Sequence, residues 1–200
     1  MVRPIETADE ELLAAADRVL MTEGPAGFTL AKAAQRAGVS AATLVKRFGS
    51  KEALFLRLSK RWVASLDGGL SISAAGHASA LARLRAVALH NYHDLDNPDT
   101  ASKQLAALAV DLQHDEMREL LHVGWGHVRA HLRKHATAAV AAGELVDCPP
   151  SGQLARIVLS TMEGGCLAWS VHPEGSLIDR LAGDLDAVLD AWTPKEPTHE

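Results

Sequence analysis

The sequence has few of the features that define secreted, membrane or disulfide-bonded proteins. Only two cysteines, Cys148 and Cys166, occur among its 200 residues. Two are too few for a disulfide framework, and we expect both to be free thiols in a reducing compartment. No run of about 18 apolar residues is present, and acidic residues occupy the N-terminal stretch where a signal peptide needs an apolar core. These absences predict a cytoplasmic protein with no membrane partner.

Several enzyme motifs are missing as well. The sequence has no Gly-rich phosphate loop, no His-Glu-x-x-His and no Gly-x-Ser-x-Gly. We therefore expect neither catalytic activity nor a cofactor.

Apolar residues recur at helical spacing along almost the whole chain, and no stretch shows the sustained alternation typical of strands. This pattern predicts an all-α fold of about nine helices. We expect an N-terminal three-helix domain at residues 1–66 and a C-terminal helical domain at residues 77–192. The stretch 68–82 between their cores is rich in Gly, Ser and Ala and has no ionisable side chain except His77. That composition is typical of a linker.

Charge is distributed unevenly along the chain. The net charge is −5, so the whole molecule lacks the basic excess typical of nucleic-acid binding. Residues 32–61, however, carry eight Lys and Arg against the single acid Glu52, a local charge of +7. This segment is expected to attract phosphates while the acidic remainder repels them.

The basic segment contains the spacing of a helix-turn-helix. Thr29 is a suitable N-cap for a helix at 30–37, and Ser40 for a helix at 41–48, with Gly38 beginning the turn between them. In this motif the second helix places its N-terminal side chains against base edges in the major groove. We expect Leu44 and Phe48 to face the core. The residues expected to face DNA are Ala41, Ala42, Thr43, Lys46 and Arg47.

These residues resemble the DNA-binding domain of TetR-family transcriptional regulators. The resemblance covers Glu11 to Trp62 and is carried by Phe28-Thr29-Leu30, Ala37-Gly38-Val39-Ser40, Thr43-Leu44 and the run from Phe48 to Leu54. It implies a homodimer that binds a near-palindromic DNA operator, and a helical C-terminal domain that binds a small effector. The resemblance leads us to expect a ligand-responsive transcriptional regulator that acts as a repressor.

The resemblance also assigns roles to single residues. Thr29 and Lys51 match positions that usually hold phosphates, and Ala41, Thr43 and Lys46 match positions near base edges. The sequence departs from the family at Val45 and Arg47, where aromatic residues are common, so one tyrosine–phosphate contact is expected to be absent.

The resemblance further implies that the last two helices pair with their copies in a dimer. The final helix has an apolar stripe, and the preceding one has small residues that permit close approach. The expected interface residues are Leu154, Ile157, Val158, Gly164, Gly165, Ala168, Leu177, Leu181, Leu185 and Val188. The alternative is that both helices pack within one subunit.

For the effector, we expect large or soft side chains on the inward faces of the middle helices to line a pocket. The candidates are Tyr92, His93, Leu108, Leu112, Met117, Trp125, Val128, Met162, Cys166 and Trp169. Side chains of these types are more often ordinary core residues than ligand contacts.

Ten histidines are present, and His127, His131 and His135 recur at every fourth position of one predicted helix. Such spacing is found in metal sites, but no carboxylate or thiolate partner follows at a recognisable interval, so no metal is assigned. Two alternatives to DNA binding stay open. The helix-turn-helix could contact a protein, or the chain could be a sensor that responds to metal through these histidines.

Overall fold

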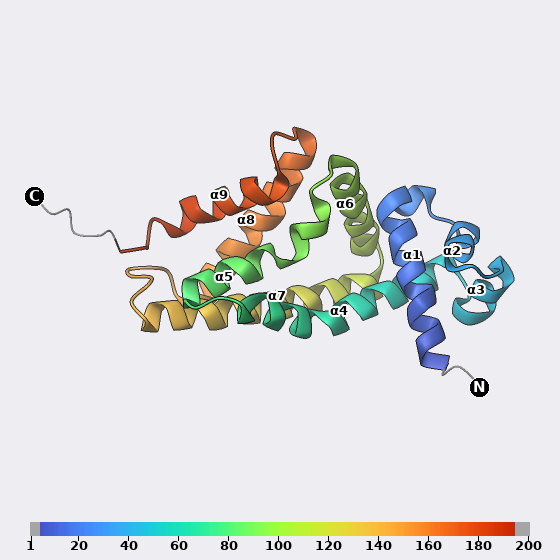
Figure 1. Ribbon diagram of the computed structural model, residues 1–200, viewed down its shortest axis with the longest axis horizontal. Coiled ribbons are helices and arrows are strands. Elements are labelled where there is room, and N and C mark those ends of the chain that lie inside the picture. The colour runs from blue at the N-terminus through green and yellow to red at the C-terminus, as the bar shows by residue number, and fades with distance from the viewer. Residues whose placement is uncertain (1–4, 195–200) are drawn as a thin grey trace, which may run out of the picture. The chain divides into compact units, whose positions relative to one another are not determined.

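The computed structural model describes residues 5–194, and every regular element in that range is helical, which confirms the predicted all-α class (Figure 1). The described elements are α1 (Ile5–Gly27), α2 (Leu30–Ala37), α3 (Ala41–Phe48), α4 (Lys51–Ala75), α5 (Ala80–Leu89), the 3-10 helix η1 (His90–Leu95), α6 (Pro98–Gln113), α7 (Asp115–Ala141), α8 (Ser151–Val171) and α9 (Leu177–Leu189). None of these helices is long and apolar enough to span a membrane.

The chain divides into two compact units. The N-terminal unit contains the residues up to Ala64 together with Asp99–Val123, and the C-terminal unit contains Ser65–Pro98 and the residues from Gly124 onward. The expected linker at 68–82 is mostly helical, since α4 continues to Ala75 and α5 begins at Ala80. Small residues are compatible with a helix interior when neighbouring side chains pack closely against them, as His90 does against Gly69.

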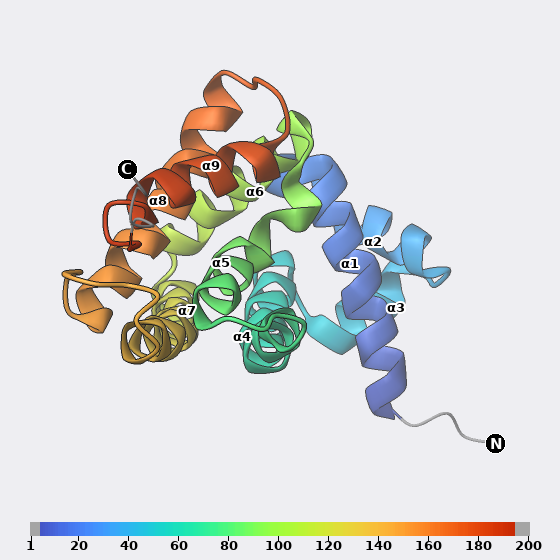
Figure 2. The same cartoon turned by 60° about the vertical axis from the view of Figure 1, so that its left-hand side comes forward.

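In the N-terminal unit, α2 and α3 lie on the same side of α1 (Figure 2). Gly24, which precedes Pro25, interrupts the helical backbone of α1 with a φ of 68°. Edge-to-face packing of the Phe28 and Phe55 rings, 5.0 Å apart, joins the loop after α1 to α4. The buried core also contains Leu44 and Phe48 of α3, as the sequence predicts.

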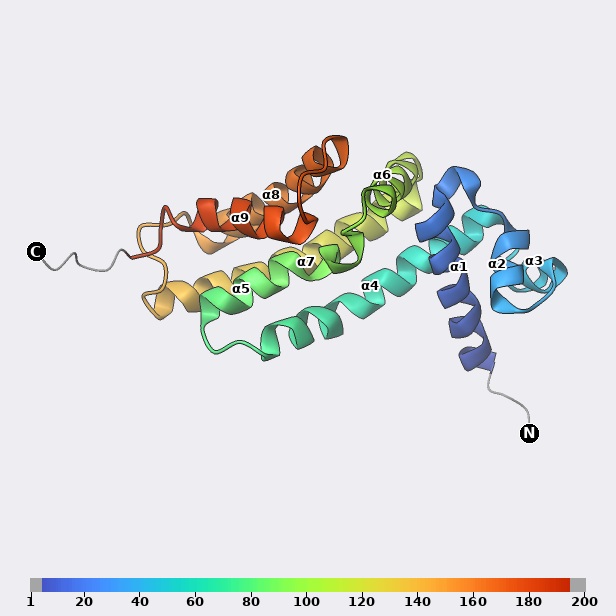
Figure 3. The ribbon, with the colours of Figure 1, turned by 45° about the horizontal axis from the view of Figure 1, so that its top comes forward.

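In the C-terminal unit, α8 and α9 run alongside each other (Figure 3). The inward stripe of α9 is completely buried and consists of Leu177, Leu181, Leu185 and Leu189. Gly165 of α8 allows this close packing, because a Cβ atom at that position would lie 2.6 Å from Cδ2 of Leu181. The two helices therefore form one packed layer within the subunit.

Hydrogen bonds at helix N-termini connect segments of the C-terminal unit that are distant in sequence. The Glu144 carboxylate accepts hydrogen bonds from the amides of Ala80 (3.2 Å) and Leu81 (2.6 Å) at the start of α5. These bonds hold the pKa of Glu144 below its usual range. The Asp96 carboxylate likewise accepts from the Leu177 amide at the start of α9. Free N–H groups of both helices are satisfied by side chains in this way.

Candidate nucleic-acid interface

The two short helices α2 and α3 are bounded by the local signals that the sequence contains. The Thr29 hydroxyl accepts a hydrogen bond from the Lys32 amide, and the Ser40 hydroxyl accepts one from the Thr43 amide, both at 3.2 Å. Gly38 ends α2 in the left-handed conformation, with a φ of 69°. The predicted helix-turn-helix is therefore formed, with α3 as its second helix.

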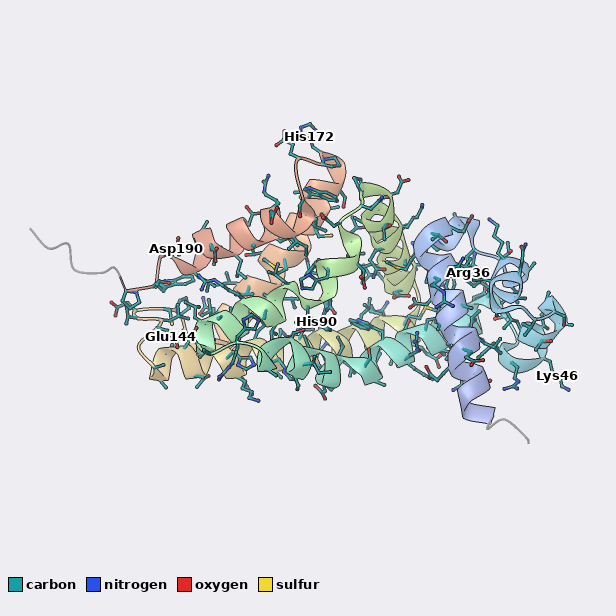
Figure 4. The ribbon with its side chains drawn as sticks, in the orientation of Figure 1. Arg36, Lys46, His90, Glu144, His172 and Asp190 are labelled. Atoms are coloured by element: carbon teal, nitrogen blue, oxygen red, sulfur yellow. The ribbon has the colours of Figure 1, made fainter. Side chains whose placement is uncertain are left out.

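The exposed side chains of α3 are small or apolar except for two cations, Lys46 and Arg47. Ala41, Ala42 and Lys46 are exposed, and Val45 is 50% exposed. Thr43 is only partly exposed, and its hydroxyl lies 2.9 Å from that of Ser40. Lys46 points outward from the helix, and none of the described residues forms a hydrogen bond or ion pair with it (Figure 4).

Other cations of the basic segment are paired with acids of α1. Arg47 forms an ion pair with Asp9, and Lys32 forms one with Glu23 at 2.6 Å. Arg61 bonds to Glu10 at 2.9 Å. The sequence alone did not indicate these pairs, because the partners lie 9 to 51 residues apart. The positive charge available to a partner is therefore smaller than a count of lysines and arginines suggests.

Lys51, a predicted phosphate-binding residue, interacts with the interior of its own domain. Its ammonium donates a 2.6 Å hydrogen bond to the Pro25 carbonyl. It also lies 5.9 Å and 5.5 Å from the ring centres of Phe28 and Phe55, within cation–π distance. These contacts make Lys51 a support for the loop that precedes α2.

The predicted effector residues are divided between the two units. Leu108, Leu112 and Met117 belong to the N-terminal unit, where Met117 is part of the buried core. His93 is exposed on η1. The remaining candidates belong to the C-terminal unit, mostly as buried side chains: Tyr92, Trp125, Val128, Met162, Cys166 and Trp169.

Glu163, which the sequence reading did not select, is at the centre of a polar cluster in the C-terminal unit. The polar groups of the Tyr92 and Trp125 side chains lie near its carboxyl group and lower its pKa, against the larger effect of burial. Burial raises the pKa of Glu163 above its usual value, and the same burial together with the nearby carboxylate raises the pKa of Tyr92. The indole nitrogen of the buried Trp169 has no hydrogen-bond partner among the described residues. The one sequence signal for Glu163 is its position three residues before Cys166, which places both residues on the same face of one helix.

Six of the ten residues predicted for the dimer interface pack within the subunit. Five side chains are completely buried within the subunit and therefore cannot contact a partner: Leu154, Val158, Leu177, Leu181 and Leu185. Gly165 packs against Leu181 of the same chain. An apolar stripe on one helix shows only that something covers it, and here α8 and α9 cover each other.

The outward face of α8 keeps the other predicted interface residues accessible. Gly164 and Ala168 are exposed and Ile157 is partly exposed, whereas Val188 is partly exposed on α9. On the same stretch of α8, Leu167 is 54% and Val171 is 79% exposed. An open depression of about 570 Å³ adjoins them, lined by Gln153, Arg156, Ile157, Ser160 and Thr161.

The histidine stripe of α7 contacts a carboxylate of α4. Nδ1 of His127 and Nε2 of His131 lie 2.9 Å and 3.2 Å from the same Asp67 oxygen. His135 is buried, and desolvation lowers its pKa. Across residues 5–194, no three side chains of His, Cys, Asp or Glu are arranged to hold a metal ion.

Comparisons with known proteins agree with this geometry. Residues 12–58 match the model of the family described as bacterial regulatory proteins, tetR family. No curated protein matches the chain in sequence.

Solved structures with the same fold cover nearly the whole chain. A TetR transcription regulator from Haloarcula marismortui aligns with a TM-score of 0.80 and 16% identity, over 95% of this chain and 100% of that one. SmeT, the repressor of the Stenotrophomonas maltophilia multidrug efflux pump SmeDEF, gives 0.67 and 22%, over 93% and 90%. The regulator FadR from Bacillus subtilis, solved with stearoyl-CoA, gives 0.70 and 17%, over 90% and 97%. The N-terminal domain of this chain therefore belongs to the tetR family of bacterial regulatory proteins, and the chain as a whole has the fold of TetR-type transcription regulators.

Proposed function

We propose that this chain is a transcriptional repressor that binds a near-palindromic operator as a homodimer and is released by a small-molecule effector. The observation that carries the proposal is the exposed face of α3, where small side chains permit close approach to base edges and Lys46 has no partner among the described residues. SmeT, which shares the fold, is a repressor.

DNA contacts are proposed for the residues that the sequence selected, with roles adjusted to their surroundings. Ala41, Ala42 and Lys46 face base edges. Ser40 caps α3 and Thr29 caps α2, and the remaining first-turn amides of both helices face phosphates. The Thr43 hydroxyl, which is bonded to Ser40, lies beside them. Arg47 contacts a phosphate only if DNA competes with Asp9.

A homodimer is proposed because two recognition helices must enter successive major grooves about 34–36 Å apart. The surface that we assign to the partner subunit is the outward face of α8, with Ile157, Gly164, Leu167, Ala168 and Val171. Its exposed apolar side chains would be covered in the dimer.

The effector is proposed to bind in the C-terminal unit beside Glu163. Tyr92 and Trp125 supply apolar surface there. On the same helix as Glu163, the buried Trp169 indole has a hydrogen-bond donor with no partner among the described residues. A ligand that binds better to the form unable to bind the operator must weaken operator binding, by no more than that difference in affinity. FadR, which has the same fold, was solved with a small-molecule thioester, stearoyl-CoA.

The test is a fluorescence-anisotropy titration of the full chain on the intergenic DNA beside its own gene, with a scrambled duplex of the same composition, at two salt concentrations. We expect nanomolar, sequence-selective binding that weakens as salt rises, because each neutralised phosphate releases counterions. Equal binding to both duplexes with no dependence on salt would contradict the proposal and favour a protein partner for the helix-turn-helix.

A further inference from the structure

The solvent face of α3 has an unusual composition for a DNA reader. Successive helical residues are rotated by about 100°, so Ala41, Val45, Ala42 and Lys46 occupy one continuous arc of about 140°. All four are exposed, and Val45 is 50% exposed. Three of the four side chains on this arc thus end in methyl groups and cannot form hydrogen bonds.

The other side chains of α3 are already engaged within the domain. Leu44 and Phe48 are buried in the core. The Thr43 hydroxyl is bonded to Ser40, and the Arg47 guanidinium is paired with Asp9. Lys46 is therefore the one long polar side chain of this helix that is free among the described residues.

Base pairs differ in what they offer such a surface in the major groove. Thymine presents a C5-methyl group, which apolar side chains contact, whereas guanine presents two acceptors that a lysine can bind. Adenine and cytosine are read through amide or carboxylate side chains, and α3 has none.

From this composition we propose that α3 reads its operator mainly through thymine methyl groups, with Val45 as a specificity-determining residue and Lys46 as the single polar reader. The inference rests on the proposed DNA binding and adds the chemistry of the recognised bases. It predicts half-sites in which T·A pairs dominate the contacted positions, with at most one G·C pair opposite Lys46.

The experiment begins with selection of duplexes from a randomised library by the full wild-type chain. In the selected duplex, each thymine is then replaced singly by deoxyuridine, which removes only the methyl group. We expect one or two replacements per half-site to lower affinity about fourfold, the equivalent of one buried methylene. The same replacements should not lower the affinity of the Val45→Ala variant any further, because this variant has already lost the contact between the Val45 side chain and the thymine methyl group.

The matched control is Val140→Ala on α7, which removes the same atoms from a side chain of similar exposure, 44%. This variant should keep the full response to deoxyuridine. Selected half-sites that contain no thymine would overturn the inference while leaving DNA binding intact. The same holds if Val45→Ala and deoxyuridine each lower the affinity by independent factors, so that the combined loss is their product. An absence of any selected sequence would contradict the proposed function itself, and this inference with it.

Discussion

At the scale of single residues, two lysines of the basic segment serve different purposes. Lys51 donates to the Pro25 carbonyl and lies near two phenylalanine rings, whereas Lys46 is exposed on α3 and engages none of the described residues. Burial and partners, rather than charge, distinguish a residue that supports the domain from one available to DNA.

This difference predicts opposite outcomes for the same substitution. Lys51→Met should lower the free energy of unfolding by about 1–2 kcal/mol, because it removes a charge-assisted hydrogen bond and the cation–π contacts. Lys46→Met should leave stability unchanged, since nothing in the domain depends on its charge. Urea unfolding followed by circular dichroism measures both, and equal stabilities of the two variants would refute the structural role of Lys51.

On DNA, Lys46→Met should reduce affinity for the selected operator more than for a scrambled duplex. A polar contact to one base contributes to discrimination, whereas a phosphate contact weakens all duplexes alike. Unchanged discrimination would remove Lys46 from the residues that read bases.

At the scale of elements, the close packing of α8 and α9 depends on one of two adjacent glycines. A Cβ at Gly165 would lie 2.6 Å from Leu181, which is completely buried, whereas a Cβ at Gly164 would meet no atom within 4 Å. Alanine substitutions at these two glycines therefore separate the effect of close packing on stability from the effect of helix propensity.

We expect Gly165→Ala to destabilise the protein by about 1–3 kcal/mol, because the buried Leu181 side chain or α9 must move. Gly164→Ala should be neutral or stabilising by up to about 1 kcal/mol, since alanine is the better helix former. Thermal unfolding of the two variants in parallel provides the measurement. Equal melting temperatures would show that α8 and α9 are packed less closely than the structure indicates.

At the scale of the whole molecule, the structure reassigns the apolar surface available to a second copy. The leucine stripe of α9 is used within the subunit, and the outward face of α8, where Leu167 and Val171 are exposed, is the candidate that we assign to a second copy. A charge placed on that face should oppose dimer formation, because it would be desolvated without a partner.

Leu167→Asp is accordingly expected to convert a wild-type dimer into a monomer at micromolar concentration, as measured by light scattering. The control is Ile72→Asp on α4, a side chain 77% exposed and remote from α8 in sequence, which should leave the dimer intact. A wild-type monomer, or a Leu167→Asp dimer, would refute the assigned interface.

Much of the fold could be predicted from the sequence because its signals are local. α2 and α3 have the predicted bounds, since Thr29, Ser40 and Gly38 act on residues within one helical turn. The prediction was less accurate at residues 68–82, where a Gly- and Ser-rich composition suggested a linker and the structure continues α4 to Ala75. Packing against residues distant in sequence can override a weak local preference.

The sequence by itself determined the helical class, the helix-turn-helix and the concentration of basic residues around it, because helical periodicity and capping depend on near neighbours. Only the tertiary structure decided which chain covers the α9 stripe, which cations are paired with α1, and that Glu163 meets Tyr92 and Trp125. These contacts join residues far apart along the chain. A local pattern shows that a face is apolar or charged, whereas its partner is selected by the packing of the whole fold.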